Sequence, residues 1–382
     1  MDKIYSKEET KELCSKNQHK EAWASIVYYA EQDDPFFLNV LGFLYQSKKE
    51  GIPLDYEKSV YYEKRAADLN YPLAFYNLGI AYRDGKGVEK NRDMYVKYME
   101  KAASLEVPGA YGALACIYAF DDERRNLEKA YTCALSGWEK NCICACVLAS
   151  FYNGGFGDSI VKQDISKAEK YYLHSISKQP TPNAYVELAD LIIKHPSCVR
   201  STYEDALNYY LKAMNFGDVY AKVQYAFQLT QGRIFGKDHF PKIKEGLQLL
   251  KDSSSESSLA CFYLGEIYAG YETCELREAI DKNLAYEYYK KGAKINNHSG
   301  CLFRLGTLIS YGIGEYGTNM ELAMLYIVKA YDVAKNENSK NYINQWRNTD
   351  FRQGQYLRKF LNEMNFNQRQ ELYKKQTYGG AI

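Results

Sequence analysis

The sequence predicts an all-α solenoid made of about eight stacked helical hairpins, and three observations lead to this fold class. A short motif recurs eight times, with spacings of 37, 36, 34, 40, 37, 39 and 41 residues between copies. Each copy contains two segments with helical periodicity, and no segment shows the sustained alternation of a strand. Repeats of roughly 20 to 50 residues indicate stacked units, because one helical hairpin cannot bury its apolar face alone.

The first helix of each copy is built around an anchor residue that is followed by Gly or Ala. The residue four positions before the anchor is Ala or Cys in seven of the eight copies, and Phe37 is the exception. These positions share one helical face, where small residues allow another backbone to approach closely. The anchors are Leu41, Leu78, Leu114, Leu148, Leu188, Tyr225, Leu264 and Leu305.

The second helix of each copy has its own register, with a small residue at its last core position in every copy. Tyrosine precedes that small residue by four positions in six copies, as Tyr98 precedes Ala102. A turn with Gly or polar residues joins the two helices, and residues 84–91 contain both Gly85 and Gly87. Glycine supplies the positive φ that such a connection needs.

Residues 73–108 carry the pattern in its most complete form. Leu78-Gly79 and Tyr82 are followed by the turn Gly85-Lys86-Gly87-Val88, and then by Tyr98 and Lys101-Ala102-Ala103. This pattern resembles the Sel-one-like repeat, a relative of the tetratricopeptide repeat. The resemblance implies a right-handed superhelix that binds proteins. Copies 3, 5 and 6 depart from the pattern; copy 3 has the charged residues 121–125 in place of the glycine turn.

The chain divides into a helical N-terminal cap at residues 1–34, eight repeats at residues 35–336, and a C-terminal helical cap and tail at residues 337–382. Two short helices are expected within residues 5–33, with Ala22, Ile26 and Ala30 on the packing side of the second. The C-terminal part carries eight basic and three acidic residues between positions 338 and 376. We interpret it as the polar outer face of a terminal repeat; a charged docking site for a partner is the alternative.

Charge and composition exclude several classes of function. The chain has 49 Lys and Arg residues against 48 Asp and Glu, so its net charge of +1 disfavours nucleic-acid binding. No apolar run is long enough to span a membrane. The N-terminus lacks the apolar segment of a secretory signal, and the ten cysteines are irregularly spaced, which indicates reduced thiols in the cytoplasm. A signal-independent export route and the oligomeric state stay open.

Three motifs could indicate catalysis or cofactor binding, and each has a structural interpretation. The string at residues 312–317 matches a dinucleotide fingerprint but falls at the turn of copy 8 rather than between a strand and a helix. Cys142 and Cys146 share a helical face, whereas Cys144 occupies a small core position, so a zinc site is disfavoured. Ser175 and Lys178 have the spacing of penicillin-recognising enzymes, but Ser175 is a packing residue. We expect no enzyme activity, cofactor or metal; a β-lactamase-like hydrolase is the less favoured alternative.

The resemblance implies that the first helix of each pair lines a concave groove. Positions two before, two after and five after each anchor then face a partner, and only three of these 24 residues are charged. Such a lining favours an apolar or helical peptide; packing within the repeats is the alternative for part of it. The candidate partner-binding residues are Phe43, Tyr76, Ile80, Arg83, Asn153, Val186, Asp190, Val223, Phe227, Phe262, Glu266 and Phe303.

The sequence therefore predicts a non-catalytic scaffold or adaptor that binds another protein or peptide in its groove. The alternative within the binding class is a bacterial toxin-immunity or effector-associated protein, which the family resemblance suggests. Substituting both Tyr76 and Phe262 by Asp is expected to abolish partner capture while the helices stay intact.

Overall fold

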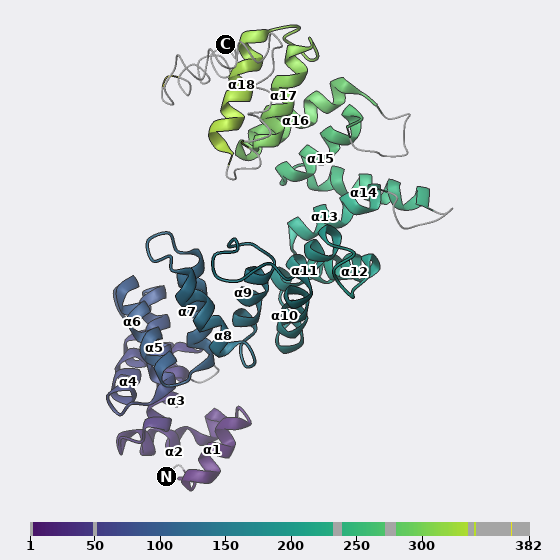
Figure 1. The fold of residues 1–382 in the computed structure, drawn as a ribbon. Coiled ribbons are helices and arrows are strands. Elements are labelled where there is room, and N and C mark those ends of the chain that lie inside the picture. Colours follow the sequence, from purple (N-terminus) through teal and green to yellow (C-terminus); the bar gives the residue numbers. More distant parts are fainter. Residues whose placement is uncertain are drawn as a thin grey trace. The chain divides into compact units, whose positions relative to one another are not determined.

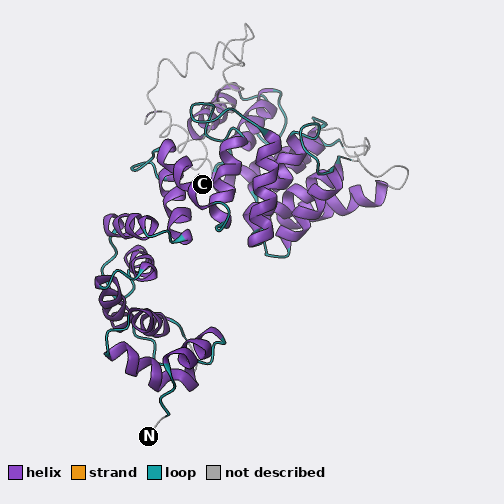
Figure 2. Cartoon of the chain, turned by 60° about the horizontal axis from the view of Figure 1, so that its bottom comes forward, coloured by secondary structure: helices purple, strands orange, loops and turns teal. Residues whose placement is uncertain are grey.

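The computed structural model describes residues 3–48, 52–231, 239–271 and 280–334, together with residues 340 and 368. These residues form eighteen α-helices and contain no strand (Figures 1 and 2). The predicted all-α fold of paired helices is confirmed. The predicted C-terminal cap falls almost entirely outside the described residues.

Two short helices precede the repeats, as predicted: α1 (Lys7–Ser15) and α2 (His19–Glu31). The following helices alternate as first and second members of hairpins. The first helices are α3 (Pro35–Gln46), α5 (Pro72–Asp84), α7 (Pro108–Phe120), α9 (Cys142–Tyr152), α11 (Pro182–Lys194), α13 (Val219–Thr230), α15 (Ser258–Ala269) and α17 (Ser299–Ser310). The second helices are α4 (Tyr56–Asp68), α6 (Arg92–Ser104), α8 (Leu127–Gly137), α10 (Ile165–Lys178), α12 (Tyr203–Met214), α14 (His239–Ser253), α16 (Lys282–Asn296) and α18 (Met320–Val333).

Local sequence explains where the helices begin. Four of the first helices, α3, α5, α7 and α11, begin with proline, whose fixed φ and missing N–H suit that position. Six of the second helices begin after an Asp or Asn whose side chain accepts a hydrogen bond from a backbone N–H of the first turn. Each such cap stabilises a helix by about 1 kcal/mol. The capping residues are Asp55, Asn91, Asn126, Asp164, Asp281 and Asn319.

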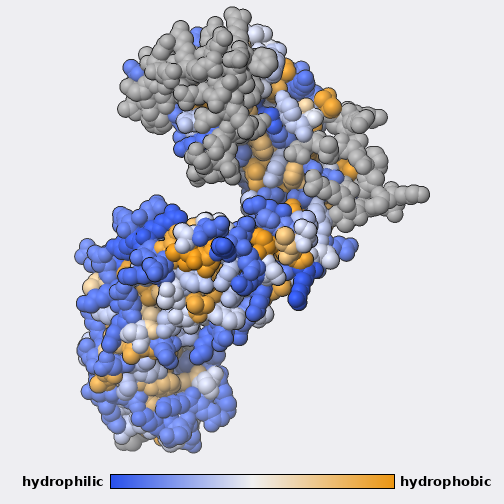
Figure 3. Space-filling model, viewed as in Figure 1, coloured by the Kyte–Doolittle hydropathy of each residue, from blue (hydrophilic) through white to orange (hydrophobic). Residues whose placement is uncertain are grey.

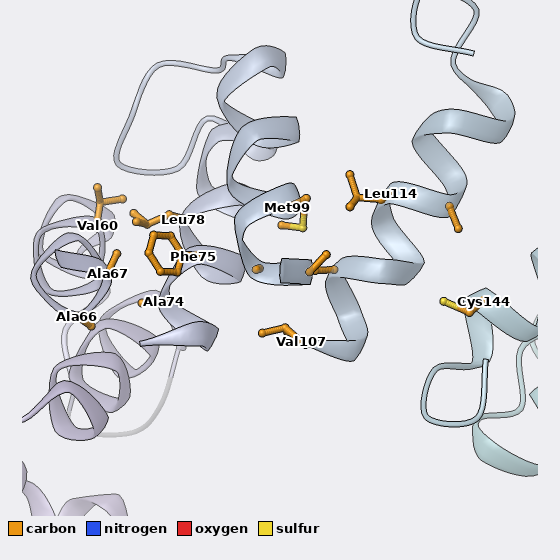
Figure 4. Close-up of a cluster of buried hydrophobic side chains, with 14 of the residues drawn as sticks. Val60, Ala66, Ala67, Ala74, Phe75, Leu78, Met99, Val107, Leu114 and Cys144 are labelled. Atoms are coloured by element: carbon orange, nitrogen blue, oxygen red, sulfur yellow. The ribbon is translucent and has the colours of Figure 1, made fainter. Parts of the chain in front are cut away.

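The chain forms two compact units, residues 1–202 (unit 1) and residues 203–382 (unit 2). The division falls between the two helices of the fifth hairpin, α11 and α12. All eight anchors are buried. Within unit 1, Leu78 and Leu114 belong to a core that continues from hairpin to hairpin and includes Phe75, Met99 and Cys144 (Figure 4).

The buried polar side chain of Glu63 joins two consecutive hairpins within this apolar packing. The carboxylate of Glu63 on α4 accepts hydrogen bonds from the side-chain amides of Asn39 on α3 and Asn77 on α5, at 2.7 and 2.9 Å. Burial raises the pKa of Glu63 to about 8. The Glu63 side chain, on the second helix of one hairpin, is therefore hydrogen-bonded to the first helix of the same hairpin and to the first helix of the following hairpin.

Candidate functional site

The predicted groove residues differ in how much surface they offer. Phe43 and Arg83 are exposed, and Arg83 pairs with Asp84 at 2.7 Å. A half-buried group comprises Tyr76, Ile80, Asn153, Asp190, Phe227 and Phe262. The buried group comprises Val186, Val223, Glu266 and Phe303, which pack within their units and offer no surface to a partner. Partner binding by the other eight stays a prediction.

In unit 2 the predicted groove residues Phe227 and Phe262 already contact neighbouring aromatic rings. Phe227 stacks on Tyr263 with ring centroids 3.9 Å apart. The Phe262 ring lies 6.3 Å from that of Tyr289 and 5.3 Å from that of His298. Replacing Phe262 by Asp would therefore disturb packing as well as any groove, so other residues give a cleaner test of binding.

Unit 1 contains an open pocket of about 280 Å³. It is lined by residues from the first helices α7, α9 and α11 and by one residue of α10. Most of its surface is apolar, and apolar surface gathers over the part of unit 1 that contains α7 and α9 (Figure 3). The pocket is lined by Cys116, Phe120, Cys142, Ile143, Cys146, Val147, Ser150, Ser175, Thr181 and Asn183. This set is called the α7–α9–α11 pocket below.

The pocket lies where the repeat register places the inner face. Cys116 and Ser150 are two residues after their anchors, and Cys146 is two before its own. Phe120 and Ile143 lie outside that register and were not among the predicted site residues, although both are large apolar side chains at helix ends. They are 61% and 44% exposed, and so form the accessible apolar rim.

The exposed ring of Phe120 is braced by other aromatic rings. Its centroid lies 5.4 Å from that of Phe156, which in turn lies 4.5 Å from that of the buried Phe151. Phe156 belongs to the loop after α9, where Gly154 and Gly157 adopt positive φ. The rim therefore holds its shape through contacts that reach the core of unit 1.

Two of the pocket thiols, Cys116 and Cys146, are held in their neutral form by burial. The sulfur of Cys146 lies 3.0 Å from the hydroxyl oxygen of Ser175, and that hydroxyl donates to the backbone carbonyl of Cys142 at 2.9 Å. Burial raises the pKa of Cys146 to about 11 and also raises that of Cys116. Protonated thiols behave as small apolar groups, so they add to the apolar character of the pocket.

Three motifs from the sequence have structural roles here. Cys144 is buried in the core of unit 1, as predicted, and the described residues contain no group of three or more His, Cys, Asp or Glu side chains arranged to hold a metal. Ser175 is fully buried and its hydroxyl is bonded to Cys142, whereas Lys178 is exposed. Residues 312–317 form the turn between α17 and α18, which confirms the expected turn.

An acidic group lies beside the pocket on α11. The hydroxyl of the buried Tyr172 is 3.4 Å from the Ser150 hydroxyl oxygen in the pocket wall and 3.4 Å from Oε2 of Glu187. Burial, and then the charge of Asp190, raise the pKa of Glu187. Glu187 is half-buried and was not among the predicted residues.

None of the described helices is both long enough and apolar enough to cross a bilayer.

Comparison with known proteins agrees with this architecture. The Sel1 repeat matches residues 38–71, 72–107, 143–176, 258–297 and 299–332. These are copies 1, 2, 4, 7 and 8, and the three copies that depart from the sequence pattern are the ones without a match. A search of curated proteins found no match.

Two solved structures share the fold. One is a protective antigen present in uropathogenic Escherichia coli strains, described as displaying an SLR fold, with a TM-score of 0.57 and 19% identity over 93% of this chain and 86% of that one. The other is a Sel1 repeat protein from Oxalobacter formigenes, with a TM-score of 0.52 and 23% identity over 63% of this chain and 94% of that one. The chain therefore contains five Sel1 repeats inside an array of paired helices.

Proposed function

We propose that this protein is a non-catalytic scaffold that binds a protein or peptide partner on the first-helix face of unit 1, with the α7–α9–α11 pocket as the anchor point. Sel1 and tetratricopeptide-like repeat proteins generally mediate protein–protein interaction. The observation that carries the proposal is an accessible apolar pocket at the inner-face register of consecutive repeats.

The size and chemistry of the pocket suit one side chain of a partner. Pockets for drug-sized ligands have about 300–1,000 Å³, and this one, at about 280 Å³, is smaller. Binding energy at protein interfaces concentrates where a large apolar side chain fills a desolvated pocket. The rim residues Phe120 and Ile143 would exclude water around such an anchor.

Substituting Phe120 and Ile143 together by Asp tests this function, because both side chains are exposed and their loss removes little core packing. Peptides enriched from a displayed random-peptide library on the wild-type protein are expected to lose affinity for the double variant by about 100-fold. Circular dichroism should show unchanged helix content. The binding constants are measured by fluorescence anisotropy with labelled synthetic copies of the enriched peptides.

Leu54 and Leu173 provide the matched control, since both are exposed apolar residues of unit 1 outside the pocket. The double variant with Asp at these positions should bind like the wild type. Equal binding by the Phe120/Ile143 variant, or equal loss in both variants, would refute the pocket as the anchor point.

A further inference from the structure

We propose that the partner segment carries a cation as well as an apolar anchor: its apolar side chain fills the α7–α9–α11 pocket while a lysine or arginine pairs with the carboxylate of Glu187. This inference rests on the proposed function and adds the chemical class of the segment, a basic apolar peptide. It is carried by the position of Glu187 beside the pocket and by a carboxylate that pairs with no cation of the described residues.

Glu187 is connected to the pocket through two hydroxyl groups. Ser150 lines the pocket, and Tyr172 lies between Ser150 and Glu187, 3.4 Å from each. The charge of Glu187 also contributes to the raised pKa of the pocket thiol Cys146, which places the carboxylate within electrostatic reach of the pocket. A segment anchored in the pocket therefore passes close to this carboxylate.

The carboxylate of Glu187 is poorly compensated. Its bond to the Tyr172 hydroxyl is long for an O–H···O hydrogen bond. Among the residues that the structure describes, no Lys, Arg or His forms an ion pair with Glu187, and Asp190 lies three residues further along α11. Within the described part of the chain, the groups that interact with Glu187 are Tyr172 from α10, Cys146 from α9 and Asp190 from its own helix, and none of these three is a cation.

A partially desolvated carboxylate favours the approach of a cation over that of an anion. Charge complementarity of this kind decides which partners bind more than how tightly they bind. The apolar pocket then supplies the anchor, and Glu187 rejects segments whose flanking residue is acidic. An acidic or uncharged apolar peptide is the competing possibility.

Replacing Glu187 by Gln tests the inference, because the substitution keeps the shape of the side chain and removes its charge. A displayed random-peptide library selected on the wild-type protein should enrich peptides with Lys or Arg next to an apolar residue. A synthetic enriched peptide is expected to bind the Glu187→Gln variant about tenfold more weakly. The same peptide with its basic residues changed to Gln should bind both proteins equally.

The pH dependence provides a second readout. The carboxylate of Glu187 is charged only above its pKa, so binding of the basic peptide should weaken as the pH falls through that value. Because the pKa is raised in the free protein, the loss should begin at a higher pH than for an ordinary glutamate. The Glu187→Gln variant should lack this dependence, and Glu128→Gln, which alters an exposed carboxylate on α8, should retain it.

The outcomes separate this inference from the proposed function. Enriched peptides without basic residues, or equal affinity of the wild type and Glu187→Gln for a basic peptide, would overturn the inference while the pocket remained the anchor point. Undiminished binding by the Phe120/Ile143 variant would overturn both. A Glu187→Lys variant that prefers the peptide with Glu in place of its basic residue would support the direct charge contact.

Discussion

Replacing Arg304 by Met is expected to destabilise unit 2 by about 3–5 kcal/mol, the usual cost of leaving one partner of a buried ion pair without the other. Nε and Nη2 of Arg304 each lie 2.7 Å from a different carboxylate oxygen of Glu266. Glu266 is 5% exposed, and the hydroxyl of Tyr289 donates to its Oε1 at 2.6 Å. Methionine keeps the apolar stem but leaves the carboxylate with the tyrosine alone.

The double variant Glu266→Gln with Arg304→Met is the control for this prediction. Removing both charges should recover much of the lost stability, because the cost comes from the uncompensated carboxylate and not from the missing pair itself. Free energies of unfolding are obtained from urea titrations followed by circular dichroism. A loss below about 1 kcal/mol in the single variant, or no recovery in the double variant, would contradict the interpretation.

Replacing Gly87 by Ala is expected to cost unit 1 about 2–5 kcal/mol, from two causes that act together. Gly87 has a φ of +71°, a conformation that costs an L-residue about 1–2 kcal/mol. A Cβ atom there would also overlap the backbone oxygen of Tyr56 at the start of α4. Because the obstacle is backbone, the turn or the helix must shift, and such overpacking adds about 1–3 kcal/mol.

The Gly85→Ala variant, in the same turn, measures the conformational cost without the steric one. Gly85 has the same φ of +71°, but a Cβ atom there would meet nothing closer than 3.4 Å. Gly85→Ala should therefore lose only the conformational part, about 1–2 kcal/mol. Urea unfolding of the two variants side by side measures the difference, and equal losses would show that the contact between the turn and α4 contributes nothing.

The repeat architecture could be predicted from the sequence because its signals are local and recur. The anchors and the small residues next to them have the same spacing in each copy, and all eight anchors are buried in the structure. The Asp and Asn residues before the second helices act within three residues of their own position. Glycine turns such as residues 85–88 require no knowledge of the neighbouring repeat to be recognised.

The residues of the candidate site could be predicted only in part, because their exposure depends on contacts between neighbouring repeats. The position of a residue within its own repeat carries no information about those contacts. Positions of the same inner-face register differ in exposure: Val223 and Phe303 are buried, whereas Cys116 and Ser150 line a pocket. Glu266 was predicted to face a partner, but Arg304, from the next repeat, already pairs with it. Opposite charges one repeat apart were the signal that could have revealed this pair.

Hydrogen–deuterium exchange of the wild-type protein, with and without an enriched peptide, tests the central claim most directly. If the first-helix face of unit 1 is the binding surface, the peptide should protect backbone amides in α7, α9 and α11. The second helix α8, which contributes no residue to the pocket, and all of unit 2 should exchange as before. Protection confined to the second helices, or to unit 2, would contradict the account.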